Sequence, residues 1–471
     1  MARLRSALHA PVDAAGLAVF RMLFGGLMAY GALRFLANGW VDRFFVKPTF
    51  FFKYWGFHWV VPIAPPVTYG AFVVMALSAL AVAVGFYYRV AIVAFLVSFL
   101  YIELLDVTNY LNHYYLVSLL ALWMAFLPLE RYWSVDAQRT PARRSSTLPA
   151  YVIYVLRFQV GVVYFYAALA KFGPDWLLHA QPLGLWMRAR TDLPLIGPFL
   201  DDPWVPLLLG WAGFLNDLLA APLLLWRRTR PWMYGTIVVF HLATKAFFSI
   251  GLFPFIMIIA ATVFFDPTWP RRWVGMARGA WAPPWLRRRA ATITPATSEA
   301  LPPVHPLRLA VFAGFCALQF ALPLRAHLYG GDVLWHEQGM RYSWRVMVRQ
   351  KNGYVMYRVL DPATGREVHV PPSRYLADYQ EREMSGQPDL ILQLAHHVHD
   401  AYVAKLGHDV EVRVDAFASL NGRGAARLID PTVDLAKIHD GVAKAHWILP
   451  APDAPPFRVP GTFADLGSWA P

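Results

Sequence analysis

Apolar residues gather in long stretches along the first two thirds of the chain. Each stretch approaches the roughly 20 residues that an α-helix needs to cross the hydrocarbon core of a bilayer. The pattern predicts about nine membrane-spanning helices, of which the fourth is short. They are expected near Ala15–Phe35, Tyr69–Tyr87, Val90–Leu105, Tyr114–Leu127, Tyr151–Ala170, Val205–Trp226, Trp232–Phe247, Ser249–Phe265 and Leu307–Leu324.

The pattern changes after Arg325, where charged residues become frequent and long apolar runs stop. Turn residues and apolar spacing in this part predict a β-hairpin, a helix and a strand. These elements are expected at Tyr354–Leu360 with Glu367–Val370, at Leu390–Leu406 and at Val410–Ala418. The fold class is therefore mainly α: a polytopic bundle over residues 1–325 and a small mixed α/β domain over residues 326–471. The Pro- and Arg-rich residues 267–306 are expected to form a linker before the last span.

Arginine and lysine are distributed unevenly over the predicted connections. If the N-terminus lies in the cytoplasm, the connections on that side carry the excess, as at Arg227, Arg228 and Arg230. Cytoplasmic loops of membrane proteins show this bias. The sequence thus predicts a cytoplasmic N-terminus, a cytoplasmic linker and an extracytoplasmic C-terminal domain.

The composition agrees with a membrane protein, since 57% of the residues are hydrophobic and only 15% are charged. Soluble chains carry about 45–50% apolar and about 25% charged residues, so a disordered protein is excluded and a purely soluble enzyme is disfavoured. The net charge of +13 is largely accounted for by the basic loops, without a nucleic-acid partner.

Cys316 is the only cysteine, which excludes an intrachain disulfide and a CxxC metal site, and no metal is expected. The long first apolar run lacks a cleavage site, so no removable signal peptide is expected.

Several ionisable residues lie within or at the ends of the predicted spans, where they are costly and usually face the bundle interior or a cavity. They are Arg21, Glu103, Asp106, Arg157, Asp217, His241 and Lys245. One interpretation is structural, with these groups pairing to lock the helices together. Because several unrelated spans contribute, we favour a polar cavity.

Two residues at the predicted outer ends of the spans are candidates for chemistry. Lys171 ends the fifth span, where a lysine often only extends its amine to the interface. If apolar side chains surround it instead, the amine gives up its proton more readily and can act as a base. His113 is either an interfacial histidine hydrogen-bonded to Asn112 or Asn109, or a proton acceptor or the group that orients one.

A set of motifs runs in order over residues 15–450. It comprises Phe20–Met28, Asp106, Asn112–His113, Tyr132–Asp136, Leu156–Gln159, Val163–Phe165, Lys171, Asp175–Trp176, His241, Phe248–Gly251, Trp269–Arg271, Tyr342–Trp344 and Ile429–Pro431. In this ordered combination the chain resembles the vitamin K-dependent γ-glutamyl carboxylases and their bacterial relatives, the HTTM-type membrane proteins. The resemblance implies an integral protein of the bacterial inner membrane.

The resemblance also implies a reaction. Reduced vitamin K, as phylloquinol or menaquinol, is deprotonated and reacts with O2, giving an alkoxide that ends as the 2,3-epoxide. The alkoxide removes the γ-hydrogen of a glutamate in a protein or peptide, and the carbanion captures CO2. Membrane lipid and a glutamate-containing polypeptide are the implied partners.

The resemblance assigns roles to particular residues. Lys171 matches the family's general base on the hydroquinone, and His113 matches the histidine that assists it. The other implied contacts are Phe248, Phe253, Met257 and Met347 for the naphthoquinone ring, and Trp344, Arg345, Arg349 and Asn112 for the substrate glutamate. Ordinary packing inside the spans explains the first four equally well. Arg345 and Arg349 depart from the animal pattern, which has an acidic residue and a histidine there.

Two alternatives stay open at this point. One is a quinol epoxidase or oxidase whose acceptor is not glutamate. The other is a transporter or assembly protein without catalytic activity that uses the intramembrane charges as a pathway. The sequence shows no paired repeat with broken helices, which weighs against a transporter.

Overall fold

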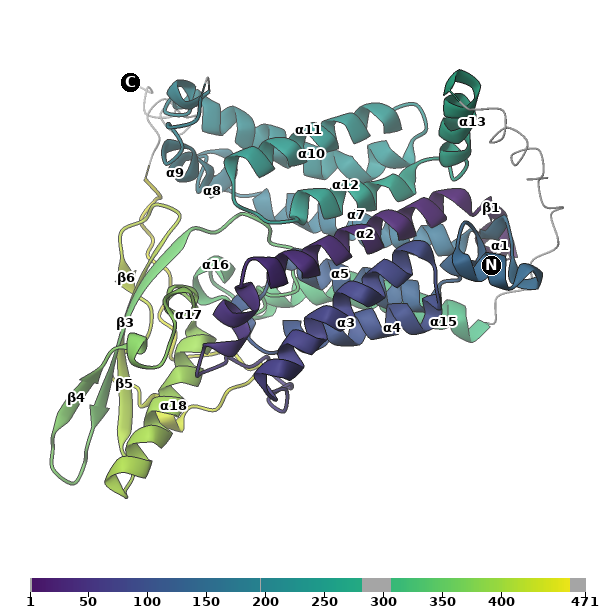
Figure 1. The fold of residues 1–471 in the computed structure, drawn as a ribbon. Coiled ribbons are helices and arrows are strands. Elements are labelled where there is room, and N and C mark those ends of the chain that lie inside the picture. The colour runs from purple at the N-terminus through teal and green to yellow at the C-terminus, as the bar shows by residue number, and fades with distance from the viewer. Residues whose placement is uncertain (1, 195, 282–305, 458–471) are drawn as a thin grey trace, which may run out of the picture.

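The computed structural model describes residues 2–194, 196–281 and 306–457. Most of them are helical, and the long helices run side by side in one bundle with a small sheet at one end (Figure 1). The helices of the bundle are α2 (Ala15–Ala37), α3 (Pro65–Val84), α4 (Tyr88–Glu103), α5 (Asn112–Phe126), α7 (Tyr151–Lys171), α10 (Trp204–Leu225), α11 (Arg230–Phe247), α12 (Phe253–Ala261) and α15 (Pro306–Ala321). Further helices in this part are α1 (Ala2–His9), α6 (Val135–Arg139), α8 (Pro174–Leu177), α9 (Leu183–Arg188) and α13 (Trp269–Trp281).

A helix lies at each of the predicted spans, but the predicted number of spans is not confirmed. Among the described residues, five helices are long and apolar enough to cross a membrane. These are α2, α3, α7, α10 and the segment Pro306–Leu328. A sixth candidate is the pair of α12, continued to Phe264, with α13, which bends by 95° at the break between them. The remaining helices, α4, α5 and α11, are too short or too polar to pass the same test, so they are not counted as candidate spans.

The predicted linker is only partly visible in the described chain. Its first part is helical, because α13 covers Trp269–Trp281. Residues 282–305 of that prediction lie outside the described residues. Helix α1 lies at the end of the bundle away from the sheet (Figure 1).

Two residues of α2, Gly25 and Arg21, shape its close contact with α3. At Gly25 a Cβ atom would lie 2.6 Å from the carbonyl oxygen of Ala79, so only glycine allows the two backbones this close. The guanidinium of Arg21 is fully buried and donates to the carbonyls of Val82 and Ala83, both at 2.7 Å, at the end of α3. The last carbonyls of a helix lack donors from a following turn. The carbonyl of Val82 also accepts from the cap amide of Gly85 at 3.1 Å, and Arg21 adds a donor to it and to the carbonyl of Ala83.

The C-terminal part is built on a four-stranded antiparallel sheet in the order β4-β3-β5-β6. The strands are β3 (Lys351–Leu360), β4 (Glu367–Val370), β5 (Glu411–Leu420) and β6 (Ala426–Arg427), and its helices are α16 (Val333–His336), α17 (Asp378–Met384) and α18 (Pro388–Leu406). In β5 every second residue from Val412 is buried, and α18 packs its apolar side into the same core through Leu394 and Val398. The predicted hairpin, helix and strand are confirmed. A two-stranded pair of β1 (Pro11–Asp13) and β2 (Thr147–Pro149) lies in the bundle part.

Polar contacts tie the sheet domain to the bundle. The guanidinium of Arg423, next to the end of β5, forms a two-armed ion pair with Asp175 in α8, with N–O distances of 2.7 and 2.8 Å. The amide of Gln380 in α17 donates to the buried carboxylate of Asp106 at 2.7 Å. Asp106 therefore connects the two parts of the chain, and burial raises the pKa of its carboxyl while this hydrogen bond opposes the rise.

We predict that Arg21→Met lowers the thermal stability of the purified protein. The substitution removes the donor to the carbonyls of Val82, Ala83 and Trp133, of which Val82 keeps a second bond from the amide of Gly85. The loss should cost about 2–4 kcal/mol in the free energy of unfolding. Arg227→Met is the matched control, because Arg227 is exposed and should be replaceable without a measurable shift. Thermal unfolding in one detergent checks both variants, and equal shifts would contradict the account of Arg21.

Candidate active site

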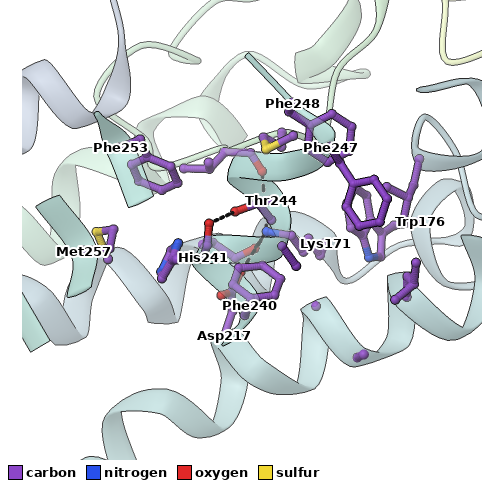
Figure 2. A pocket seen from close by; sticks show the side chains of 18 of the residues that line it. Lys171, Trp176, Asp217, Phe240, His241, Thr244, Phe247, Phe248, Phe253 and Met257 are labelled. Carbon is purple, nitrogen blue, oxygen red and sulfur yellow. Dashed lines mark hydrogen bonds and ion pairs between the residues drawn. The ribbon is translucent and has the colours of Figure 1, made fainter. Parts of the chain in front are cut away.

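A mainly apolar cavity lies among α7, α10, α11 and α12. Most of its lining is aromatic or aliphatic, and its polar side chains are Lys171, Asp217, His241, Tyr164 and Thr244. Figure 2 shows Lys171 and His241 with the rings of Phe240, Phe247, Phe248 and Phe253 around them, Met257 on one side and Trp176 on the other. The cavity therefore has a wide apolar surface with a few polar groups at defined places, which is typical of a ligand site.

Lys171 is the last residue of α7, and its side chain is held by three oxygens. Its Nζ lies 2.8 Å from the carboxylate of Asp217 in α10, 3.3 Å from the carbonyl of Ala167 and 3.4 Å from the carbonyl of Val346. It also lies 5.4 Å from the ring centre of Trp176. Lys171 and Asp217 are only 4% and 5% exposed. The amine is thus fixed inside the bundle and does not extend to the membrane surface.

Asp217 changes the expected character of the lysine. The sequence suggested an amine among apolar neighbours, whereas the structure places a carboxylate beside it. The pair of a lysine ammonium and an aspartate carboxylate has no net charge. The pair can accept one further proton, and the two side chains together then carry a single positive charge.

His241 supplies a third polar group on the cavity wall. It is 1% exposed, its Nε2 lies 3.1 Å from the hydroxyl of Tyr164, and its Nδ1 is buried without a hydrogen-bond partner in the described structure. Its ring makes an edge contact with Phe253, with centres 5.5 Å apart. Asp217 and His241 were expected only as parts of an unspecified polar cavity. Asp217 and His241 lie in the first and second predicted spans after the span that Lys171 ends, and the sequence gave no signal of their contacts with it.

The structure brings together all four residues expected at the quinone ring. Phe248, Phe253, Met257 and Met347 line the same cavity as Lys171. The first three come from the end of α11 and from α12, whereas Met347 reaches the bundle from the segment that precedes β3.

The segment from Tyr342 to Met347 has an unusual backbone. Tyr342, Trp344 and Met347 have φ angles of 63°, 57° and 54°, in the left-handed region that residues with a side chain rarely adopt. Such strain persists only where the surrounding structure enforces it, and it is frequent at functional sites. Here the strained path places the carbonyl of Val346 on Lys171 and the side chain of Met347 in the cavity.

His113 lies behind the cavity wall and is not among its lining residues. It is buried at the start of α5, and its ring centre lies 5.6 Å from that of Phe253 and 4.7 Å from that of Tyr114. Its influence on a ligand beside Lys171 would therefore pass through Phe253.

The residues expected to hold the substrate glutamate do not line the Lys171 cavity. Trp344 is buried and stacks on Tyr115, with ring centres 4.8 Å apart. The amide of Asn112 donates to the carbonyl of Arg345 at 3.4 Å. Arg349 already forms an ion pair with Glu337, so its charge is compensated within the chain. Arg345 differs, because its Nε is buried without a partner among the described residues and burial lowers the pKa of its guanidinium.

Comparison with known families agrees with this arrangement. The family model of the HTTM domain matches residues 9–269, more than half of the chain. The chain belongs to the HTTM family. The lumenal domain of the vitamin K-dependent gamma-carboxylases matches residues 304–454. The predicted resemblance is confirmed, and this HTTM protein is a membrane protein of the vitamin K-dependent carboxylase kind with an extracytoplasmic domain. No solved structure was found to match the chain.

The two matched domains of this HTTM protein meet at the Lys171 cavity. Lys171 and Asp217 belong to the HTTM match, and Val346 and Met347 belong to the lumenal-domain match. The hydrogen bond from Lys171 to Val346 crosses between them. The site is therefore incomplete in either domain alone.

We predict that replacing one member of the buried pair is more harmful to stability than replacing both. Lys171→Met and Asp217→Leu each leave an unpaired charge in the bundle and should cost about 3–5 kcal/mol. The double variant should unfold close to the wild-type temperature, since neither charge remains. Thermal unfolding of the four proteins measures this coupling, and additive losses in the double variant would contradict the ion pair.

Proposed function

We propose that this HTTM protein is a vitamin K-dependent γ-glutamyl carboxylase of the bacterial inner membrane. The observation that carries the proposal is the buried Lys171–Asp217 pair, which faces an apolar cavity beside Phe248, Phe253 and Met257. In this proposal residues 1–325 form the catalytic bundle with a cytoplasmic N-terminus. Residues 326–471 form an extracytoplasmic domain that completes the site and receives a glutamate-containing protein or peptide.

When bound, reduced vitamin K together with O2 would supply the strong base that removes the γ-hydrogen of glutamate before CO2 is added, with the 2,3-epoxide and water as the other products. The residues of the chain fit such a ligand. Phe248 and Phe253 offer flat apolar surfaces to a fused ring, and Met257 and Met347 offer adaptable side chains. A quinol dissolved in the membrane could enter a bundle cavity of this kind without leaving an apolar environment.

The Lys171–Asp217 pair would take the proton from a quinol hydroxyl. The neutral pair becomes singly positive when it accepts that proton, and the ligand becomes singly negative, so the sum of charges in the cavity is unchanged. The resulting ammonium lies where it can stabilise the anion, which is favourable in a site of low dielectric constant. The carbonyls of Ala167 and Val346 orient Nζ before and after the transfer.

The apolar lining has a second task, because a base able to attack a γ C–H bond would be quenched by bulk water. Phe240, Phe247 and Phe253 enclose the polar groups, and few polar atoms other than the named side chains reach the cavity (Figure 2). Exclusion of water also strengthens each electrostatic contact inside the site.

A second candidate function has its own support. Arg349 is paired with Glu337, and neither Arg345 nor Trp344 lines the cavity, so the glutamate contacts implied by the family are not assembled beside Lys171. This observation favours a quinol epoxidase whose acceptor is not glutamate. A transporter or assembly protein remains a third candidate and predicts no consumption of O2 with reduced vitamin K.

One assay separates these functions. Purified protein is given reduced vitamin K, O2, labelled bicarbonate and a glutamyl peptide, and epoxide and peptide-bound label are measured together. A carboxylase forms both products. Epoxide without label supports the epoxidase, and the absence of both, with no O2 consumed, excludes the proposed function.

We predict that Lys171→Ala abolishes both epoxide formation and carboxylation, with a rate loss of about 10²–10⁴-fold for the missing proton acceptor. Because the single variant leaves Asp217 unpaired, Lys171→Ala/Asp217→Asn serves as a second variant that should fold better and stay inactive. Lys245→Ala is the matched control, since Lys245 lies on α11 outside the cavity lining and should be dispensable. Wild-type epoxidation in the double variant would exclude Lys171 as the base.

We predict that His113→Phe, which keeps a ring against Phe253 but removes both nitrogens, lowers the epoxidation rate by about 10–100-fold. If His113 only fills space, His113→Phe should form epoxide at the wild-type rate, and only His113→Ala should be slower. His369→Ala is the control, because His369 is an exposed residue of β4. Initial rates of epoxide formation check the three variants.

A further inference from the structure

A second cavity lies among α2, α3, α4 and α5, near the start of α12. Helix α12 forms the wall between the two cavities. Leu252 and Ile256 line the second cavity, whereas their neighbours Phe253 and Met257 line the Lys171 cavity. The second cavity is therefore separate from the site proposed above.

One end of this cavity is apolar and lies near the middle of the helices. It is lined by Met28, Met75 and Phe95, and by Phe72, whose ring stacks on Phe35 with centres 5.3 Å apart. Along α4 the lining runs from Phe95 to Glu103, which corresponds to about 12 Å at 1.5 Å per residue. This length and lining suit an extended hydrocarbon chain.

The other end of the cavity holds three polar groups that lack partners. Three of the residues that line the cavity carry such an atom: Nε of Arg34, Oε1 of Glu103 and Nδ2 of Asn109. Each of these atoms is buried and has no hydrogen-bond partner in the described structure. They come from three separate segments of the chain. Buried polar atoms of this kind cost about 1–3 kcal/mol each when unsatisfied. Three such atoms around one cavity indicate that a ligand head group completes them.

We propose that the second cavity binds a neutral, single-chain amphiphile with a hydroxyl-bearing head group. Its hydroxyl oxygens would accept hydrogen bonds from Arg34 and Asn109, and a hydroxyl hydrogen would be donated to Glu103. A neutral head group adds no charge next to Arg34 and Glu103. A phosphate head would instead lie against the carboxylate of Glu103, which disfavours an anionic lipid.

The test uses the whole protein in phosphatidylcholine nanodiscs and a photoreactive monoacylglycerol with a diazirine in its acyl chain. After illumination, the label is expected on peptides that contain Met28, Met75 or Phe95. Excess monoolein should compete, and lysophosphatidic acid, which has one chain and an anionic head, should compete about tenfold less well. Label only on lipid-facing residues or in the Lys171 cavity, or equal competition by both lipids, would overturn the proposal.

Two variants test the two ends of the site. Glu103→Leu removes the acceptor for the head group and should reduce labelling about tenfold. It should not lower the thermal stability of the ligand-free protein, because the lost carboxyl oxygen has no partner there. Val117→Phe adds bulk from α5 into the cavity and should reduce labelling similarly. Val97→Phe, on the exposed side of α4, is the control and should label like the wild type. Unchanged labelling in Glu103→Leu would overturn the proposal even if Val117→Phe failed to fold.

Discussion

Lys171 and Asp217 form an ion pair that is almost completely removed from solvent, with 2.8 Å between its charged atoms. Burying two charges is costly unless the geometry is good and further hydrogen bonds satisfy the remaining groups. The bundle meets this constraint by bringing the end of α7 against the middle of α10 and by supplying two carbonyls to the amine. The position of the amine is thereby fixed relative to the aromatic lining.

The second carbonyl, that of Val346, comes from outside the bundle helices. It lies in a segment where Tyr342, Trp344 and Met347 all have positive φ angles, which the surrounding contacts must enforce. Contacts such as the Arg423–Asp175 pair hold the sheet domain where this segment can reach Lys171. The extracytoplasmic domain is therefore part of the site.

Much of this arrangement could be predicted from the sequence because it depends on local pattern. Apolar periodicity located the helices and the hairpin, and the family motifs led to Lys171, Phe248 and Phe253, which the structure places around one cavity. The number of spans could not be predicted, because short helices such as α5 are apolar yet too short to pass as spans. The partner of Lys171 and the engagement of Arg349 by Glu337 depend on contacts between distant segments, which leave no trace in local spacing.

The central claim is that the Lys171–Asp217 pair receives a proton from a quinol bound in the adjoining cavity. A structure of the protein with a non-reactive vitamin K hydroquinone analogue tests it most directly. The account predicts the fused ring between Phe248, Phe253 and Met257, with one ring oxygen within hydrogen-bond distance of Nζ of Lys171. A ring bound in the second cavity, or in the Lys171 cavity with both oxygens turned away from that nitrogen, would contradict it.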